Sequence, residues 1–368
     1  MGGVRQRGGE GVRAMAERLN NVDGLRGIAA LLVIVGHWGE FVADHARDPA
    51  VAETMRAALL SYFSFGRTGI VAFFCISGFV IPFSFRGSSP KRGFLISRFF
   101  RLYPAYWLSI LVGLVTVPLV TGSSFSASEI AANATMVPLF LRASPVIGVY
   151  WTLHIELVFY AACFVLFAVH RLHDARVNAV LLCCYVAVGV AAGAYRFTHT
   201  GSNLPIGVPT YLAAMHFGTL TRLHLLERDR HAARLFVPAL AILLAGVLVT
   251  NTLGYIHASD EAMGWIATDT GYLTGVALFL LCVGRGMFGH RRLAYAGMIS
   301  YSLYLFHIPV IQCWEALWPH LGDWRIAALL GTAFVFAVAI GVSSLVYRFV
   351  ERPAIRVARR IEARLDTR

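Results

Sequence analysis

The sequence has few charged residues and almost no lysine. Only 14% of its 368 residues are charged, whereas soluble domains carry about a quarter. Lys91 is the one lysine in the chain. With 57% hydrophobic residues and a mean hydropathy of +0.65, this shortage of charge excludes an ordinary soluble protein and indicates an integral membrane protein.

Several other signals are missing. The six cysteines form no CxxC pair and have no metal-like spacing, so we expect small core residues, no disulfide framework and no metal. Residues 1–20 lack the apolar core and the cleavage site of a signal peptide. The basic residues are not interleaved with aromatic residues into a patch, which argues against nucleic acid as a binding partner.

Long apolar runs follow one another through the chain, and a window of about 20 residues per spanning helix predicts an all-α polytopic fold with about ten transmembrane helices. A further stretch, 131–142, is too short to cross and is predicted to be a loop. The ten segments are 25–43, 67–85, 104–121, 150–169, 177–195, 207–223, 235–252, 264–284, 293–314 and 326–347.

The basic residues are distributed unevenly over the connections. Of the 32 lysines and arginines, 26 fall on one set of alternate connections, which includes both ends of the chain. Cytoplasmic loops carry the excess of arginine and lysine, so we predict that both termini are cytoplasmic. The net charge of +12 then reflects topology and contact with anionic lipid. The six basic residues of the other set are Arg47, Arg56, Arg67, Arg142, Arg196 and Arg325.

The apolar segments leave no room for a separate soluble domain. We therefore predict a cytoplasmic tail over 1–20, one transmembrane domain over 21–350 and a basic amphipathic tail helix over 351–368 at the inner leaflet. Internal repeats and paired glycine-broken helices are not visible in the sequence, which argues against a secondary transporter.

The run "DGLRGIAALLVIVGHW" places Arg26 and His37 in an apolar segment. At about 100° per residue, their separation leaves them within about 20° of each other on one helical face. Ionisable groups at such depth face protein or water and are functional candidates. A structural histidine that bonds a neighbouring hydroxyl is the alternative for His37.

The run "VYWTLHIELVFY" places Glu156 at a depth similar to that of His37, on a helix that runs the opposite way. A carboxylate beside an imidazole would orient the ring and support a general base. We predict that Tyr150 and Trp151 line a substrate pocket, as does Asp23, which lies just before the first segment. His154 points elsewhere and is interpreted as structural.

The run "ISYSLYLFHIPV" places Tyr304 and His307 three residues apart in the ninth segment. We predict that both line the pocket. The alternative is a polar seam that only joins helices.

The stretch "SPKRGFLISRFFRLYP" contains Arg98 and Arg101 one helical turn apart. Two guanidiniums on one face suit a phosphate group, although the same residues could simply anchor the cytoplasmic side. Just before them, Ser77 and Gly78 allow close backbone approach, and we include them with Arg26 among the predicted donor-binding residues.

Taken in order, the Arg26 and His37 motif, "ISGFVI", the Arg98 and Arg101 pair, "YWTLHIELVFY", "YSLYLFHIPV" and the closing "VERP" resemble the membrane acyltransferase-3 family. The resemblance extends from residue 20 to about 355. It implies a multi-pass enzyme of a bacterial inner membrane that moves an acyl group, usually acetyl, from cytoplasmic acyl-CoA to a sugar hydroxyl. The acceptors known across the family are glycans, glycolipids and glycosylated natural products.

The expected mechanism follows from the resemblance and the residues together. Arg26, Arg98 and Arg101 would bind the coenzyme A phosphates, His37 would act as general base and Glu156 would support its imidazolium. A transporter or flippase for a glycolipid or polymer is the alternative function, and a scaffold with buried polar seams is a third. The sequence leaves the acceptor, the acyl chain length, the side of acceptor entry and the oligomeric state open.

Overall fold

The computed structural model describes residues 2–202, 204–257 and 264–366. These residues are predominantly helical, and no strand occurs among them. The helices form two compact units: unit 1 comprises residues 1–36, 57–82 and 170–300, and unit 2 comprises residues 37–56, 83–169 and 301–368. The division passes through the first helix, α1 (Gly2–His45), which contributes to both.

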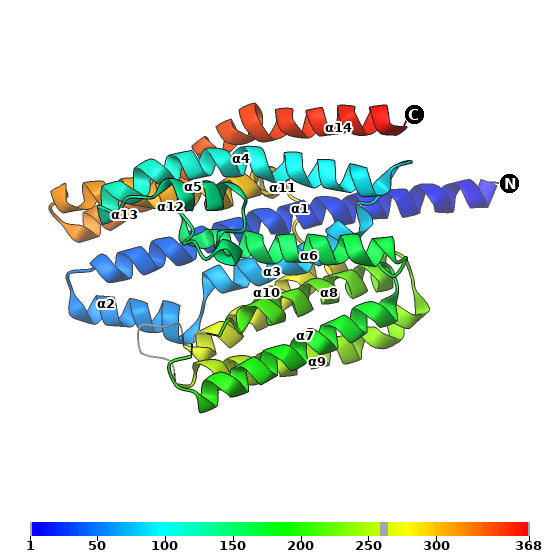
Figure 1. The fold of residues 1–368 in the computed structure, drawn as a ribbon, viewed down its shortest axis with the longest axis horizontal. Helices are drawn as coiled ribbons and strands as arrows, with labels where there is room; N and C mark the ends of the chain where they lie inside the picture. The colour runs from blue at the N-terminus through cyan, green and yellow to red at the C-terminus, as the bar shows by residue number, and fades with distance from the viewer. Residues whose placement is uncertain (1, 203, 258–263, 367–368) are drawn as a thin grey trace. The chain divides into compact units, whose positions relative to one another are not determined.

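Unit 1 is a bundle built on five long helices (Figure 1). Helix α8 packs against α3, α7 and α9, and α10 packs against α3 and α9. The elements of unit 1 beside α1 are η1 (Ala57–Tyr62), α3 (Phe65–Val80), α7 (Ala175–Thr198), α8 (Gly207–Leu225), α9 (Arg230–Tyr255), α10 (Trp265–Arg285) and α11 (Arg291–Met298).

Unit 2 contains the remaining helices and the C-terminal segment (Figure 1). Helix α14 packs along α4, and the π-helical turn η6 packs against α4, α13 and α14. The elements are α2 (Pro49–Arg56), α4 (Pro90–Thr121), α5 (Ala127–Ala134), η3 (Pro138–Leu141), η4 (Gly148–Tyr150), α6 (Trp151–Ala168), α12 (Ser300–Leu317), η5 (Trp318–His320), α13 (Trp324–Val346), η6 (Tyr347–Glu351) and α14 (Arg352–Asp366). The turn η2 (Ile81–Phe83) lies where units 1 and 2 meet in the sequence.

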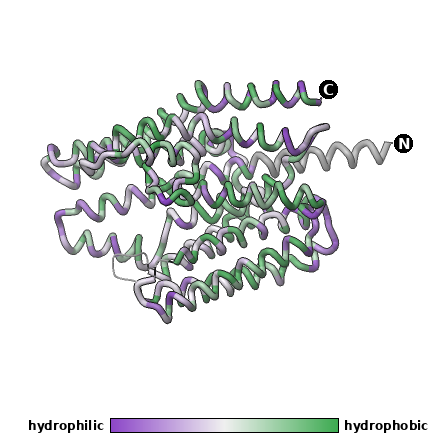
Figure 2. The backbone as a smooth tube through the Cα atoms, in the orientation of Figure 1, coloured by the Kyte–Doolittle hydropathy of each residue, from purple (hydrophilic) through white to green (hydrophobic). Residues whose placement is uncertain are grey.

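Within the described ranges, eight helices are long and apolar enough to cross a membrane, and nine if the bent pair α11 and α12 forms one span. Figure 2 shows the hydrophobic residues along these helices and hydrophilic residues at many of the turns. The prediction of an all-α, multi-pass fold is therefore confirmed. The number of about ten spanning helices and the cytoplasmic location of both termini stay predictions. Each of the ten predicted segments overlaps a helix.

Helix α8 accounts for one difference from the predicted count. It covers the predicted segment 207–223 but is not among the eight spanning candidates, because residues such as His216 and Arg222 lower its hydropathy. Its residues are buried continuously from Pro209 to Leu223. A helix enclosed all round by other helices can carry polar side chains that a lipid-facing helix cannot.

Two local predictions need correction. The stretch 131–142 is not a loop throughout, since α5 and the turn η3 occupy most of it. A capping box at Ser126 and Glu129 starts α5. This helix signal lies before residue 131, whereas the loop prediction rests on the length of 131–142 alone. The ninth predicted segment is broken at Ile299, where α11 and α12 meet at a bend of 71°.

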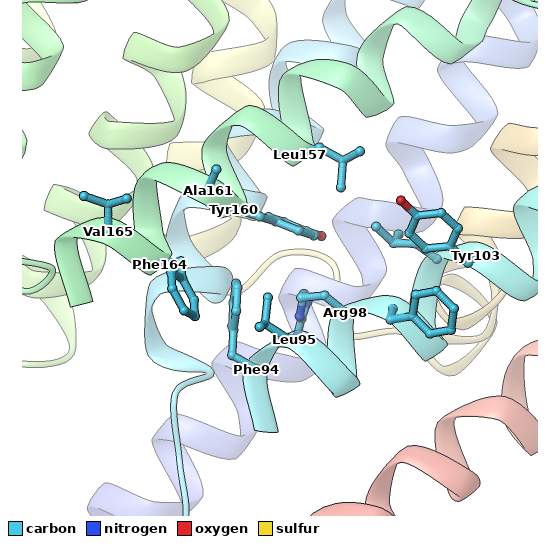
Figure 3. A pocket seen from close by; sticks show the side chains of 11 residues that line it. Phe94, Leu95, Arg98, Tyr103, Leu157, Tyr160, Ala161, Phe164 and Val165 are labelled. Carbon is cyan, nitrogen blue, oxygen red and sulfur yellow. The ribbon is translucent and has the colours of Figure 1, made fainter. Parts of the chain in front are cut away.

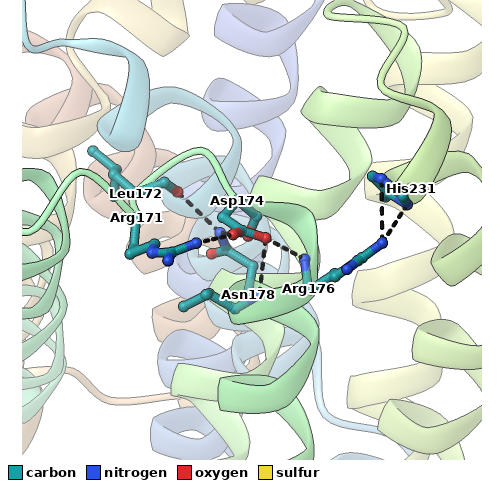
Figure 4. Close-up of polar contacts among 7 residues, drawn as sticks. Arg171, Leu172, Asp174, Arg176, Asn178 and His231 are labelled. Carbon is teal, nitrogen blue, oxygen red and sulfur yellow. Dashed lines mark hydrogen bonds and ion pairs between the residues drawn. The ribbon is translucent and has the colours of Figure 1, made fainter.

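The connection between α6 and α7 is held by Asp174 (Figure 4). Its carboxylate accepts hydrogen bonds from the backbone N–H groups of Arg176 and Val177 and pairs with Arg171 at 3.0 Å. Partial burial alone would raise the pKa of Asp174, but these hydrogen bonds and the arginine outweigh it and hold the pKa below its ordinary value. The side chain of Asn178 closes the turn by donating to the carbonyls of Leu172 and Asp174.

Close backbone contacts explain several glycines. A Cβ at Gly78 on α3 would lie 1.7 Å from the carbonyl oxygen of Met215, and one at Gly218 on α8 would lie 2.1 Å from that of Cys75. Gly24 on α1 approaches the carbonyl of Phe288 in the same way. These glycines let helices in unit 1 pack at short range.

Candidate active site

Two histidines of unit 2 form the centre of the candidate site. Nδ1 of His37 on α1 lies 3.2 Å from Nε2 of His307 on α12, and the ring centroids are 5.1 Å apart. His307 is completely buried, whereas His37 is half-buried. The structure therefore brings together two residues that were predicted to have separate roles, as base and as pocket lining.

The hydrogen bonds define the protonation of both rings when they are neutral. Nδ1 of His307 lies 2.7 Å from the carbonyl oxygen of Tyr304, and a carbonyl can only accept, so this nitrogen carries the proton. Nε2 of His307 is then an acceptor, and Nδ1 of His37 must donate to it. In this tautomer the lone pair of His37 lies on Nε2.

Tyrosines on the same helix connect α12 to its neighbours in unit 2. The hydroxyl of Tyr304 lies 2.7 Å from that of Thr152 on α6 and donates to the carbonyl of Val149. One turn earlier, the hydroxyl of Tyr301 donates to the carbonyl of Leu102 on α4. These contacts form a polar seam, which was the alternative for this segment, and they hold the helix that carries His307. The predicted pocket lining stays a prediction.

Glu156 has a different partner from the one predicted. Among the hydrogen bonds of the described residues, its carboxylate is paired with the hydroxyl of Tyr160 at 2.6 Å and not with His37. Because Tyr160 is the residue four positions later on α6, Glu156 and Tyr160 form a pair within one helix. The ring of His307 is instead within hydrogen-bond distance of His37.

Arg101 takes part in a buried ion pair. Its guanidinium lies 3.3 Å from a carboxylate oxygen of Glu351, whose side chain is fully buried. The other oxygen of Glu351 accepts a short hydrogen bond from Ser302 on α12. Glu351 thus joins α4 and α12 from the π-helical turn η6, and such turns often occur at functional sites.

Arg98, one turn from Arg101, faces a different environment. It lines a cavity of about 500 Å³ between α4 and α6, together with Phe94, Tyr160 and other mostly apolar residues (Figure 3). The guanidinium carbon lies 5.8 Å from the ring centre of Phe94 and 5.7 Å from that of Tyr160. The two arginines predicted to share one phosphate site therefore have separate surroundings.

Four predicted residues belong to unit 1. Arg26 and Asp23 are half-buried on α1, and Ser77 is half-buried on α3. Gly78 is buried where α8 packs, and its carbonyl accepts a hydrogen bond from Thr219. Helix packing accounts for the lack of a side chain at Gly78, and the predicted contact of these residues with donor or substrate stays a prediction.

The remaining predicted residues lie around the start of α6. Tyr150 is fully buried, and its hydroxyl lies 2.7 Å from that of Ser109, while Trp151 is half-buried. The ring nitrogens of His154 contact the backbone of Tyr150 and of Leu139. These contacts agree with the structural interpretation of His154 and show Tyr150 packed in the core of unit 2.

Sequence reasoning missed Glu351, Ser302 and Tyr160 as individual residues. The signal for Glu351 was a carboxylate directly after an apolar segment, within the "VERP" motif. From the sequence alone, Glu351 looks like the first polar residue of the C-terminal tail. Its role in an ion pair becomes visible only when its partner Arg101, 250 positions earlier, is known. In the part of the chain that the structure describes, no group of three or more His, Cys, Asp and Glu side chains could hold a metal ion.

Comparison with known proteins identifies the family. The model of the acyltransferase-3 family, described as an acyltransferase domain, matches residues 19–348. The chain belongs to the acyltransferase-3 family. The resemblance seen in the sequence is thereby confirmed, and this multi-pass protein is a membrane acyltransferase that uses an acyl donor. His37 and His307 lie within the matched region, whereas the closing "VERP" lies just after it.

Two relatives are similar along most of the chain. Nodulation protein 10 of Rhizobium leguminosarum bv. viciae is 25% identical, with 94% of this chain and 95% of the relative aligned. The exopolysaccharide production protein ExoZ of Rhizobium meliloti (strain 1021) is 27% identical, with 83% of this chain and 96% of the relative aligned. No solved structure matches significantly.

Proposed function

We propose that the protein is an O-acyltransferase that moves an acetyl group from acetyl-CoA to a sugar hydroxyl, with His37 as general base. The observation that carries this proposal is the hydrogen bond between His37 and the buried His307. It favours the His37 tautomer with a lone pair on Nε2, and the buried ring of His307 holds the His37 ring in place. A general base at this position would supply about 10²- to 10⁴-fold of the rate.

The proposed reaction is a direct transfer. Nε2 of His37 removes the proton of the acceptor hydroxyl while the oxygen attacks the thioester carbonyl. The carbon–sulfur bond then breaks, and the coenzyme A thiolate takes the proton from His37. During the reaction Nδ1 of His37 keeps its proton and donates a hydrogen bond to Nε2 of His307. A neutral imidazole thus stabilises the imidazolium, which is the role that the sequence predicts for Glu156. A covalent acyl-histidine is the less favoured variant.

The donor site is proposed from the arginines on the predicted cytoplasmic side. A guanidinium has five N–H donors, so Arg101 can hold Glu351 and a donor phosphate at once. Arg26 on α1 is a second candidate for the phosphates. Arg98 lies in the apolar cavity between α4 and α6, and a different ligand is proposed for it below.

The acceptor class is proposed from the relatives. One of them is named for exopolysaccharide production and the other for nodulation. The exopolysaccharide name supports a sugar acceptor, whether a cell-envelope glycan, a glycolipid or a glycosylated natural product. The rhizobial relatives also support a bacterial inner membrane as the location.

A calorimetric titration of the detergent-purified protein with acetyl-CoA and with coenzyme A tests the donor. We expect micromolar binding of both ligands, and binding weakened by Arg26→Gln. Slow release of coenzyme A without an acceptor would further support an acyltransferase that uses this donor. Failure to bind either ligand would contradict the proposal and would favour the alternative in which the intramembrane charges line a translocation path for a glycolipid or polymer.

A further inference from the structure

The cavity between α4 and α6 combines an apolar lining with one cation. Its volume is about 500 Å³, within the range of small-molecule sites. Of the lining side chains, Leu95, Phe99 and Val165 are also exposed on the protein surface. On a membrane protein such a surface faces lipid, so the cavity is open to hydrocarbon chains from the side.

Arg98 is the one charged side chain in the lining (Figure 3). Its Nε is buried and makes no hydrogen bond to any described residue. The rest of the guanidinium interacts with the hydroxyl of Tyr160 and, at longer range, with the carboxylate of Glu362, but no described carboxylate lies within ion-pair distance of it. One turn away, Arg101 has Glu351 as its partner. Since the buried Nε keeps an unused donor and a cation at membrane depth is stabilised by a close opposite charge, the ligand of this cavity is expected to bring an anion.

The position of Arg98 along α4 fits an anion at the edge of the bilayer. It lies about 12 Å along the helix axis from Pro90, whose end of α4 is cytoplasmic in the predicted topology. Lys91 and Arg92 are exposed at that end. Long basic side chains reach from such a depth toward the lipid phosphates, and basic pockets between transmembrane helices on the cytoplasmic side bind anionic lipid head groups.

We propose that this cavity binds an anionic phospholipid of the inner leaflet, with one acyl chain against the aromatic and aliphatic lining and the phosphate on Arg98. A lipid carries its phosphate directly beside its chains, as the cavity with its single guanidinium requires. In acyl-CoA the phosphates and the acyl group are separated by the pantetheine arm. The proposal therefore separates Arg98 from the donor-binding role that was predicted for the arginine pair.

Native mass spectrometry of the purified full-length protein, with phosphatidylglycerol or phosphatidylcholine added after delipidation, tests the site. We expect one tightly retained phosphatidylglycerol and weaker retention of phosphatidylcholine. Arg98→Gln should weaken phosphatidylglycerol binding about fivefold. The matched control Arg92→Gln removes an exposed charge from the same helix and should leave the retained lipid in place.

A second variant tests the cavity without changing the charge. Ala161 lines the cavity from α6, and Ala161→Trp should fill it and release the lipid while Arg98 is kept. Equal retention in wild type, Arg98→Gln and Ala161→Trp would overturn the proposal, as would equal losses in Arg98→Gln and Arg92→Gln. Donor titrations separate this site from the proposed function: acetyl-CoA affinity should be unchanged in Arg98→Gln, and loss of donor affinity with lipid retained would also overturn it.

Discussion

Units 1 and 2 each contain a fully buried histidine, and the two differ in whether the buried ring faces a second imidazole. In unit 1, Nδ1 of His216 bonds the side-chain oxygen of Asn178 at 2.9 Å, and the ring stacks on Tyr185. In unit 2, Nδ1 of His307 bonds the carbonyl oxygen of Tyr304, and Nε2 meets the ring of half-buried His37. Both histidines have a fixed tautomer, but only His307 is seen to orient a second imidazole.

Replacement of His307 is expected to have the largest effect on activity. His307→Phe removes the acceptor for Nδ1 of His37, so the tautomer with the lone pair on Nε2 loses its support. We expect kcat to fall about 10²-fold or more, with donor affinity unchanged in calorimetry. His307→Gln retains a donor and an acceptor and should recover part of kcat. Equal activity of His307→Phe and wild type would contradict a positioning role.

Replacement of Glu351 compares a buried ion pair with an exposed one in unit 2. Glu351→Gln leaves the partly buried guanidinium of Arg101 without its countercharge. Breaking a fully buried pair costs about 3–5 kcal/mol of unfolding free energy, which is the upper limit expected here. Asp44→Asn breaks the pair of Asp44 with Arg56, whose side chains are 61% and 50% exposed, and should cost at most about 1 kcal/mol. Thermal unfolding in detergent measures both.

Equal stability of Glu351→Gln and Asp44→Asn would contradict the structural role of the buried pair. If Glu351→Gln instead kept its stability but lost donor affinity, Glu351 would belong to the donor site through Arg101.

Replacement of Gly78 tests helix packing in unit 1. The Cβ of Gly78→Ala would meet the backbone of Met215, and overpacking of this kind costs about 1–3 kcal/mol. Gly284→Ala on α10 is the control, because no atom of another residue lies within 4 Å of its added Cβ. Thermal unfolding should separate the two variants. A Gly78→Ala protein of normal stability with weakened donor binding would favour the predicted donor contact over packing.

The sequence predicted the class of fold because long apolar runs are a strong local signal. The helices, their order and the family motifs could be read directly from it. It could not show that α8 is enclosed by other helices or that Ile299 breaks the ninth segment, since both depend on neighbours in space. For the same reason, the sequence predicts about ten spanning helices where the described residues contain eight or nine candidates.

For the site, residue types were easier to predict than partners. His37 and Glu156 were paired by their similar depth, but depth says nothing about rotation around each helix. His307 was recognised as polar lining, and its contact with His37 depends on how α1 and α12 pack. Arg98 and Arg101 share a motif, yet only Arg101 reaches the carboxylate that "VERP" supplies.

The most direct test of the account is a matched pair of variants, His37→Gln and His216→Gln, assayed for acyl transfer and for acetyl-CoA binding. Glutamine keeps a hydrogen-bond donor at both positions but cannot act as a base. The account predicts that His37→Gln binds acetyl-CoA and transfers no acyl group, whereas His216→Gln does both. An active His37→Gln protein would contradict His37 as general base, and a His216→Gln protein that folds and binds donor but transfers nothing would contradict the distinction between the two histidines.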